Sequence, residues 1–176
     1  MSLDGYINDS AGSVERLFSD LESIRDSKVM QEAISDTGAV VMGKNAFLMA
    51  GDPDSYADTY EFQVPIFVLT EKAPEKKPKE NKKLTFTFVT EGIEAAVAQA
   101  KVAAGDRDVV IIGGANTAQQ ALRAGVVDEI QIDIMPVILN GGLRLFENIG
   151  PDIIELEKAQ VIELPARTHI RLRVLK

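Results

Sequence analysis

The sequence predicts a three-layer α/β/α sandwich on a mixed, mostly parallel sheet that ends in antiparallel C-terminal strands. Over the first two thirds of the chain, short apolar runs alternate with amphipathic or alanine-rich segments, as in parallel strands joined by helices. The last third alternates apolar and polar residues with no helical segment between, which is typical of antiparallel strands with one solvated face. With 176 residues and no internal repeat, residues 1–176 are expected to form a single domain.

The first helical segment is expected after the loop DGYINDSAGS, with Ser13 as its N-cap. Apolar residues from Val14 to Ile24 recur at three- and four-residue spacing, and the pattern resumes less regularly as far as Ile34. The next segments are predicted as a buried strand, the start of a helix and a turn-rich loop: GAVVMG (38–43), KNAFLMA (44–50) and residues 51–62.

The middle of the chain repeats this alternation. Strands are predicted at VPIFVLT (64–70), LTFTFVT (84–90) and DVVIIGG (108–114), the first and last of them buried. Helices are predicted at residues 91–104, capped by Thr90, and at residues 116–125, closed by Gly125. The lysine-rich segment 71–83 mixes acid, base and proline, so a solvated linker is expected there. Alternating strands are expected at residues 128–139, 153–164 and 167–176, with a turn at 140–142.

Composition narrows the classes of function. The chain has no cysteine and one histidine, His169, which excludes disulfides, thiolate sites and multi-histidine metal sites. A net charge of −8 argues against a nucleic-acid partner, because phosphate contacts need a concentrated basic surface. No apolar run approaches membrane-spanning length and no signal-peptide pattern is visible, so a cytoplasmic protein with no membrane partner is expected.

Two junctions between a strand and a helix are candidate anion sites. In VVIIGGANTAQQAL (109–122), Gly113 and Gly114 precede a helix whose free N–H groups could meet a phosphate, and Asn116 or Thr117 could cap it. The full dinucleotide and phosphate-loop fingerprints are absent, so this junction is as often a structural turn as a ligand site. In VVMGKNAF (40–47), Lys44 opposes the helix dipole, which fits a phosphate partner and a solvated lysine equally well.

Three strand ends are therefore expected to share one crevice. They carry Lys44, Thr70 and the pair Gly113–Gly114, and ligands of open α/β sheets bind outside the carboxyl ends of strands. His169 is interpreted as a strand histidine that points outward and has no chemical role. The aspartates of DPDSYAD (52–58) lack calcium-loop spacing, and no catalytic triad or isolated general acid is visible.

In this order the segments resemble the dihydrofolate reductase-like superfamily and, more narrowly, the C-terminal reductase domain of the bifunctional riboflavin-biosynthesis deaminase–reductase. The resemblance covers nearly the whole chain. The segments that carry it are SLDGYI (2–7), VVMGKNAF (40–47), PIFVLT (65–70), VVIIGGANTAQQAL (109–122) and AGVVDEIQIDIMPVILNGGLRLF (124–146).

The resemblance implies a reductase that transfers hydride from NADPH to a small heterocyclic or carbonyl substrate. The family activity is reduction of 5-amino-6-(5-phosphoribosylamino)uracil. By resemblance, the cofactor-binding residues are Gly43, Lys44, Asn45, Ala46, Leu69, Thr70, Gly113, Gly114, Ala115, Asn116 and Thr117, with Lys44 facing the 2′-phosphate. The loop over the substrate would begin with Asp4, Gly5, Tyr6 and Ile7. A homodimer is implied as well, with MPVILNGGLRLF (135–146) near its interface.

Three departures from the family pattern concern the substrate and the start of the fold. Ile112 stands where riboflavin-pathway reductases carry a substrate-binding glutamate. Dihydrofolate reductases carry a carboxylate on the first long helix, after a tryptophan-containing loop, whereas this chain has no tryptophan. No motif singles out a carboxylate for that place among Glu15, Asp20, Glu22 and Asp26. The family also has a strand ahead of SLDGYI, so a missing or substituted first strand is expected.

Three alternatives to the riboflavin-type reductase remain open. A dihydrofolate or other pterin reductase would keep the same cofactor. A non-catalytic nucleotide-binding protein would keep the crevice without the chemistry, and the missing glutamate and acid favour it. A structural domain that binds nothing is favoured by the acidic net charge, which opposes a polyanionic cofactor. No residue is predicted as catalytic.

Overall fold

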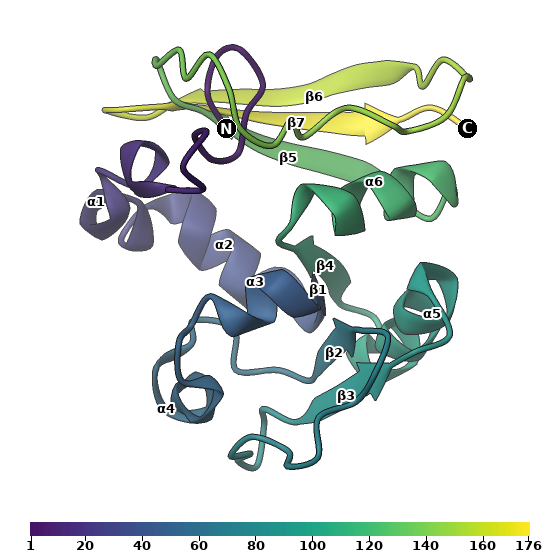
Figure 1. Ribbon diagram of the computed structural model, residues 1–176. Coiled ribbons are helices and arrows are strands. Elements are labelled where there is room, and N and C mark those ends of the chain that lie inside the picture. Colours follow the sequence, from purple (N-terminus) through teal and green to yellow (C-terminus); the bar gives the residue numbers. More distant parts are fainter.

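The computed structural model describes residues 1–176, and its strands form two sheets. The parallel sheet has the order β3-β2-β1-β4 and consists of β1 (Thr37–Gly43), β2 (Ile66–Leu69), β3 (Phe86–Val89) and β4 (Asp108–Ile112). The antiparallel sheet has the order β5-β7-β6 and consists of β5 (Glu129–Ile134), β6 (Leu156–Glu163) and β7 (Thr168–Val174). Figure 1 shows the antiparallel sheet at one end of the molecule. The predicted strand directions are confirmed, but the strands do not join in one mixed sheet.

Helices cover both faces of the parallel sheet, which gives the predicted three layers. Ala39 and Val41 of β1 point toward α5 (Ile93–Ala104) and α6 (Ala115–Arg123). Val40 and Met42 point to the opposite face. That face is covered by α2 (Lys28–Asp36), α3 (Lys44–Leu48) and the α4 segment (Tyr56–Thr59). Because successive strand residues alternate between faces, one apolar run supplies both cores.

The outer edge of β4 carries no strand. No backbone hydrogen bond joins β4 to β5, and the end of β5 pairs instead with Met1–Leu3, through a parallel bridge between Ser2 and Met135. Residues Val109–Ile112 are consequently only partly buried, so the expectation of a fully buried strand was wrong there. The family strand expected ahead of residue 1 stays a prediction.

The first helical segment is broken into three pieces: η1 (Glu15–Leu17), α1 (Leu21–Arg25) and α2. Ser27 causes the second break, because its backbone is extended and its hydroxyl accepts from the Met30 N–H at 3.2 Å. Ser13 does not cap a long helix as predicted, since Val14 precedes a single 3-10 turn. Thr90 does not cap α5 either, because Gly92, with φ of +98°, leads directly into the helix.

The lysine-rich segment 71–83 is exposed but attached to the sheet. The Glu80 carboxylate accepts from the Phe86 N–H at 2.7 Å, and Lys77 Nζ donates to the Phe86 carbonyl at 3.2 Å. Lys79 also pairs with Asp58 of α4, at 2.7 Å. The segment thereby covers the outer edge of β3, where unpaired backbone groups would otherwise remain. None of the helices is both long and apolar enough to cross a membrane.

Candidate nucleotide-binding site

The structure brings the predicted strand ends together. In the sheet, Gly43 pairs with Leu69, and Met42 pairs with Ile112. The carboxyl ends of β2, β1 and β4 therefore lie side by side in that order. The chain enters α3 directly after Gly43, and only Gly113 and Gly114 separate Ile112 from the start of α6, so two helix N-termini open at the same edge of the sheet.

The two glycine junctions contact each other closely. A Cβ built on Gly43 would lie 2.3 Å from Thr117 Oγ1, and one built on Gly113 would lie 2.3 Å from Ala46 Cβ. Neither distance is tolerable for real atoms, so glycine at both positions lets α3 and α6 approach. Gly113 also has φ of +94°, a conformation that other residues rarely adopt. Packing therefore explains these two glycines without a ligand.

Gly114 has different surroundings. Its φ is +52°, and the nearest atom to an added Cβ would be Thr117 Oγ1 at 3.8 Å, so space is open there. It is the N-cap of α6, and no side chain caps the helix. The expected caps were therefore wrong: Asn116 Oδ1 accepts from Gln120, and Thr117 is buried against Gly43. The N–H groups of Ala115 and Asn116 remain free for an anion, as helix N-termini allow, whereas the Thr117 N–H donates to the Gly114 carbonyl at 3.1 Å.

A cavity of about 300 Å³ lies beside the β1 and β2 ends. Its apolar lining comes from Phe47, Leu48, Val68, Ala73, Pro74 and Phe88, and its polar lining from Lys44, Thr70, Lys72 and Glu75. Lys44 takes part in no ion pair, which leaves its ammonium free. The wall formed by residues 72–75 belongs to the segment interpreted as a solvated linker. The lysines of this segment could have indicated an anion-binding wall. Because acids and prolines are mixed with them, the composition favoured a solvated linker instead.

The predicted substrate loop does not line this cavity. The Asp4 carboxylate accepts from the Leu139 and Asn140 N–H groups at 3.1 and 2.9 Å. The Ser2 hydroxyl and these backbone donors lower the pKa of Asp4 to about 2. Residues 5–7 pair with residues 143–145, whose carbonyls at 144 and 145 accept from the buried Gln119 side chain of α6 at 3.0 and 3.2 Å. The loop is thus joined to the crevice through α6.

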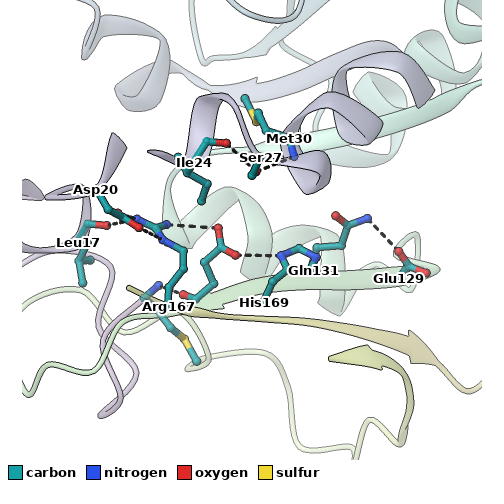
Figure 2. Close-up of polar contacts among 11 residues, drawn as sticks. Leu17, Asp20, Ile24, Ser27, Met30, Glu129, Gln131, Arg167 and His169 are labelled. Carbon is teal, nitrogen blue, oxygen red and sulfur yellow. Dashed lines mark hydrogen bonds and ion pairs between the residues drawn. The ribbon is translucent and has the colours of Figure 1, made fainter. Parts of the chain in front are cut away.

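A buried ionic cluster lies between α1 and the antiparallel sheet (Figure 2). Arg167 donates to both oxygens of Asp20, to the Leu17 carbonyl at 3.1 Å and to Asp133 at 3.3 Å. His169 is 4% exposed, and its Nδ1 lies 2.9 Å from Asp133 Oδ1. The expectation that His169 points outward was wrong, because Asp133 on the neighbouring strand gives it a buried partner. A single sequence offers no signal for that pairing across strands.

The charges in this cluster stabilise each other. Hydrogen bonds from the Arg167 guanidinium lower the pKa of Asp20. Burial by itself raises the pKa of Asp133, but His169 and Arg167 outweigh that effect and hold it below its usual range. None of these residues lines the cavity, and Asp20 is fully engaged by Arg167. The cluster therefore fixes residues 17–20 on the antiparallel sheet.

An open parallel sheet with a cavity and two helix N-termini at its carboxyl edge is the arrangement in which α/β domains commonly bind ligands. The family model described as RibD C-terminal domain matches residues 1–170. The chain belongs to the RibD C-terminal domain family.

Solved structures show the same fold at low sequence identity. A protein of Shewanella sp. PV-4 named for riboflavin biosynthesis is 22% identical with a TM-score of 0.78, over 100% of this chain and 96% of that one. The Thermotoga maritima deaminase and 5-amino-6-(5-phosphoribosylamino)uracil reductase is 15% identical with a TM-score of 0.66, over 99% of this chain and 54% of that one. Dihydrofolate reductase from Enterococcus faecalis, complexed with NADP(H), is 16% identical with a TM-score of 0.63, over 100% and 93%. The fold is therefore dihydrofolate reductase-like, as predicted.

Proposed function

We propose that this protein is an NADPH-dependent reductase of the riboflavin-biosynthesis type. The observation that carries the proposal is the set of three adjacent strand ends, with a free lysine over a partly apolar cavity on one side and the open N-terminus of α6 on the other. Family membership supports the reaction class, and the NADP(H) complex of the dihydrofolate reductase neighbour supports the cofactor.

The residues fit the parts of a phosphorylated dinucleotide. Lys44 and Thr70 would face the 2′-phosphate and the ribose, with Leu69 beside them. The free N–H groups at Gly114–Asn116 would receive the pyrophosphate, since the space beside Gly114 is open. Gly43 and Gly113 would act indirectly by letting Ala46 and Thr117 close the crevice. When bound, NADPH supplies the hydride, and the protein holds the two reactants in place and excludes water.

The cofactor assignment is tested by titrating the protein with NADPH and NADH while following cofactor fluorescence. NADPH is expected to bind more tightly, and Lys44→Met is expected to remove most of that preference, because the 2′-phosphate loses a charged partner. Lys101→Met is a matched control, since Lys101 is an exposed lysine on α5, outside the cavity. Equal affinity for both cofactors in the unmodified protein would contradict the assignment.

Turnover decides between the riboflavin-type substrate and its alternatives. We expect NADPH oxidation with the aminouracil ribose phosphate and none with dihydrofolate, since Asp20, one of the candidate carboxylates for a pterin, is engaged by Arg167. Ile112 in the place of the family glutamate favours the non-catalytic alternative. NADPH binding without turnover of either substrate would establish that alternative.

We also propose that the protein forms a homodimer through the segment 135–146. Ile138 and Leu143 in this segment are 52% and 51% exposed, and Phe146 is 38% exposed. Neighbouring exposed apolar side chains mark interaction surfaces. Sedimentation equilibrium is expected to give twice the monomer mass, and Ile138→Glu is expected to shift the equilibrium to monomer. A monomer at all concentrations would refute this proposal.

A further inference from the structure

One wall of the cavity is held in place only at its ends. Residues 72–76, which we call the strap, are all exposed and connect the end of β2 to the residues that cover the edge of β3. Residues 73–76 make no hydrogen bond within the chain, through either backbone or side chains. None of the charged residues of the strap forms an ion pair. The position of this wall therefore depends on its two attachments.

The first attachment is at Thr70, where the chain leaves β2. The Thr70 N–H donates to the Val89 carbonyl at 3.0 Å, which fixes this residue to β3. Its hydroxyl donates to the Lys72 carbonyl at 3.0 Å and accepts from the Lys72 N–H at 3.4 Å. A hydroxyl that bonds to the backbone two residues further on stabilises a local turn. The strap thus begins at a turn whose hydrogen bonds all go to Thr70.

The second attachment is at Lys79. Its N–H donates to Asp54 Oδ1 at 2.8 Å, and its ammonium pairs with Asp58 at 2.7 Å. The side chains of this pair are 54% and 59% exposed, and exposed ion pairs are weak. Lys77, between the strap and Lys79, reaches β3 only through its ammonium, at 3.2 Å. The firm hold begins at Glu80, whose carboxylate accepts from a backbone N–H of β3 at 2.7 Å.

The strap has space on both of its sides. The cavity of about 300 Å³ lies against residues 72–75, and a second cavity of about 230 Å³ lies between Pro74, Lys76 and residues 52–54. Pro74 lines both cavities and has no N–H group, so it can move without breaking a backbone donor bond. Leu48 also lines both cavities and is 50% exposed. Closure of the strap over a ligand would therefore cover apolar surface as well.

We propose that the strap opens and closes over the cavity, with Thr70 as its hinge and the contacts of Lys79 to Asp54 and Asp58 as its latch. Opening admits a ligand, and closure places the Lys72 ammonium, which has no carboxylate partner, beside a bound anion. The identity of the ligand rests on the proposed function: the nucleotide cofactor enters while the strap is open, and its phosphates hold Lys72 when the strap is closed. The strap thereby controls entry and release of the cofactor.

Because the chain has no cysteine, a single introduced thiol reports opening. Val68 lines the cavity and Val40 does not, although both are 0% exposed and face the same core. Val68→Cys is expected to react faster with N-ethylmaleimide than Val40→Cys, since local opening costs less free energy than unfolding. Lys79→Met should accelerate the reaction of Val68→Cys alone, by about 1.5- to 5-fold, the range for a lost exposed ion pair. Lys176→Met, which removes the exposed pair with Asp128, is the matched control and should change neither rate.

Trypsin reports whether the cofactor closes the strap. Cleavage after Lys76 requires this part of the chain to leave its place in the fold. Lys76 does not line the larger cavity, so a cofactor bound there does not shield it directly. Saturating NADPH is expected to slow cleavage after Lys76. Cleavage after Lys82, beyond the latch, should stay unchanged.

The outcomes separate this inference from the proposed function. If Val68→Cys reacts no faster than Val40→Cys, or if Lys79→Met accelerates neither or both alike, the inference is overturned. If NADPH binds by its fluorescence but cleavage after Lys76 is unchanged, closure of the strap by the cofactor is overturned. If NADPH fails to bind while Lys79→Met exposes Val68→Cys alone, the strap stands and the reductase proposal falls.

Discussion

Replacing Gly43 by alanine is expected to destabilise the protein through a single contact. The added Cβ would lie 2.3 Å from Thr117 Oγ1, whereas carbon atoms attract at roughly 3.5–4.0 Å. Gly43 has φ of −75°, so alanine introduces no backbone strain and the cost is steric. Overpacking of this kind costs about 1–3 kcal/mol, which corresponds to a fall in melting temperature of about 2–12 °C for a chain of this length.

Because the clash involves the Thr117 hydroxyl, removing that hydroxyl should relieve it. With Thr117→Ala the hydroxyl is gone, and the nearest remaining atom, Thr117 Cβ, lies 3.6 Å from the added carbon, an ordinary contact. In that background Gly43→Ala should cost less than about 0.5 kcal/mol, so the double mutant should be more stable than the sum of the two single losses predicts, by at least about 0.5 kcal/mol. Urea unfolding of the four proteins measures each free energy.

A matched control is available at Gly141. Its added Cβ would meet Ser10 Cβ at 3.6 Å, so Gly141→Ala should change the free energy of unfolding by less than about 0.5 kcal/mol. The reasoning is refuted if Gly43→Ala is as harmless as Gly141→Ala. It is refuted equally if Thr117→Ala fails to reduce the cost, since the clash would then lie elsewhere.

Three further predictions concern stability. Arg167→Met should cost about 3 kcal/mol in urea unfolding, because it leaves Asp20 and Asp133 without their partner. Arg173→Met, which removes an exposed pair, should cost less than about 1 kcal/mol. Similar losses for the two variants would contradict a structural role for the cluster. The pKa of Asp4 is lowered from 3.8 to about 2, so the unfolded chain takes up this proton at higher pH than the folded chain. The stabilisation from Asp4 is therefore present above pH 4 and lost as the pH falls toward 2. Asp4→Asn should flatten that part of a plot of urea midpoint against pH, and an unchanged slope would refute this expectation. At Gly114, where φ is +52° and space is open, alanine should lower stability by about 1–3 kcal/mol through backbone strain alone. An unchanged free energy of unfolding in urea would show that this conformation carries no such cost.

The sequence was most informative where an element continued through one apolar run. The strand GAVVMG and the helix start at Lys44 were predicted within one residue, because the run, the glycine and the polar residue follow in immediate succession. The gathering of Lys44, Thr70 and Gly113 followed from the rule that parallel strands end at one edge. Gly125, with φ of +64°, closes α6 as expected.

Features that depend on distant partners could not be predicted in this way. Leu17 and Ile24 continue the helical spacing, but Ser27 and the attachment of residues 17–20 to Arg167 break the helix. His169 alternates like an outward residue, yet Asp133 on the adjacent strand receives it. Thr90 has good capping chemistry, but Gly92 takes the N-cap position with a conformation that threonine would avoid. The roles of Gly43 and Gly113 in packing required the positions of Thr117 and Ala46.

Gln119 and Arg167 attach different parts of the C-terminal third to the preceding chain, and acid should weaken only the attachment at Arg167. The Gln119 amide donates to carbonyls and carries no titratable group, so its attachment persists as the pH falls. Arg167 holds residues 17–20 through the Leu17 carbonyl and the Asp20 carboxylate, and the carboxylate protonates in acid. We therefore expect an acid intermediate in which residues 17–20 have detached from Arg167, while the loop at residues 143–145 is still bonded to Gln119 of α6.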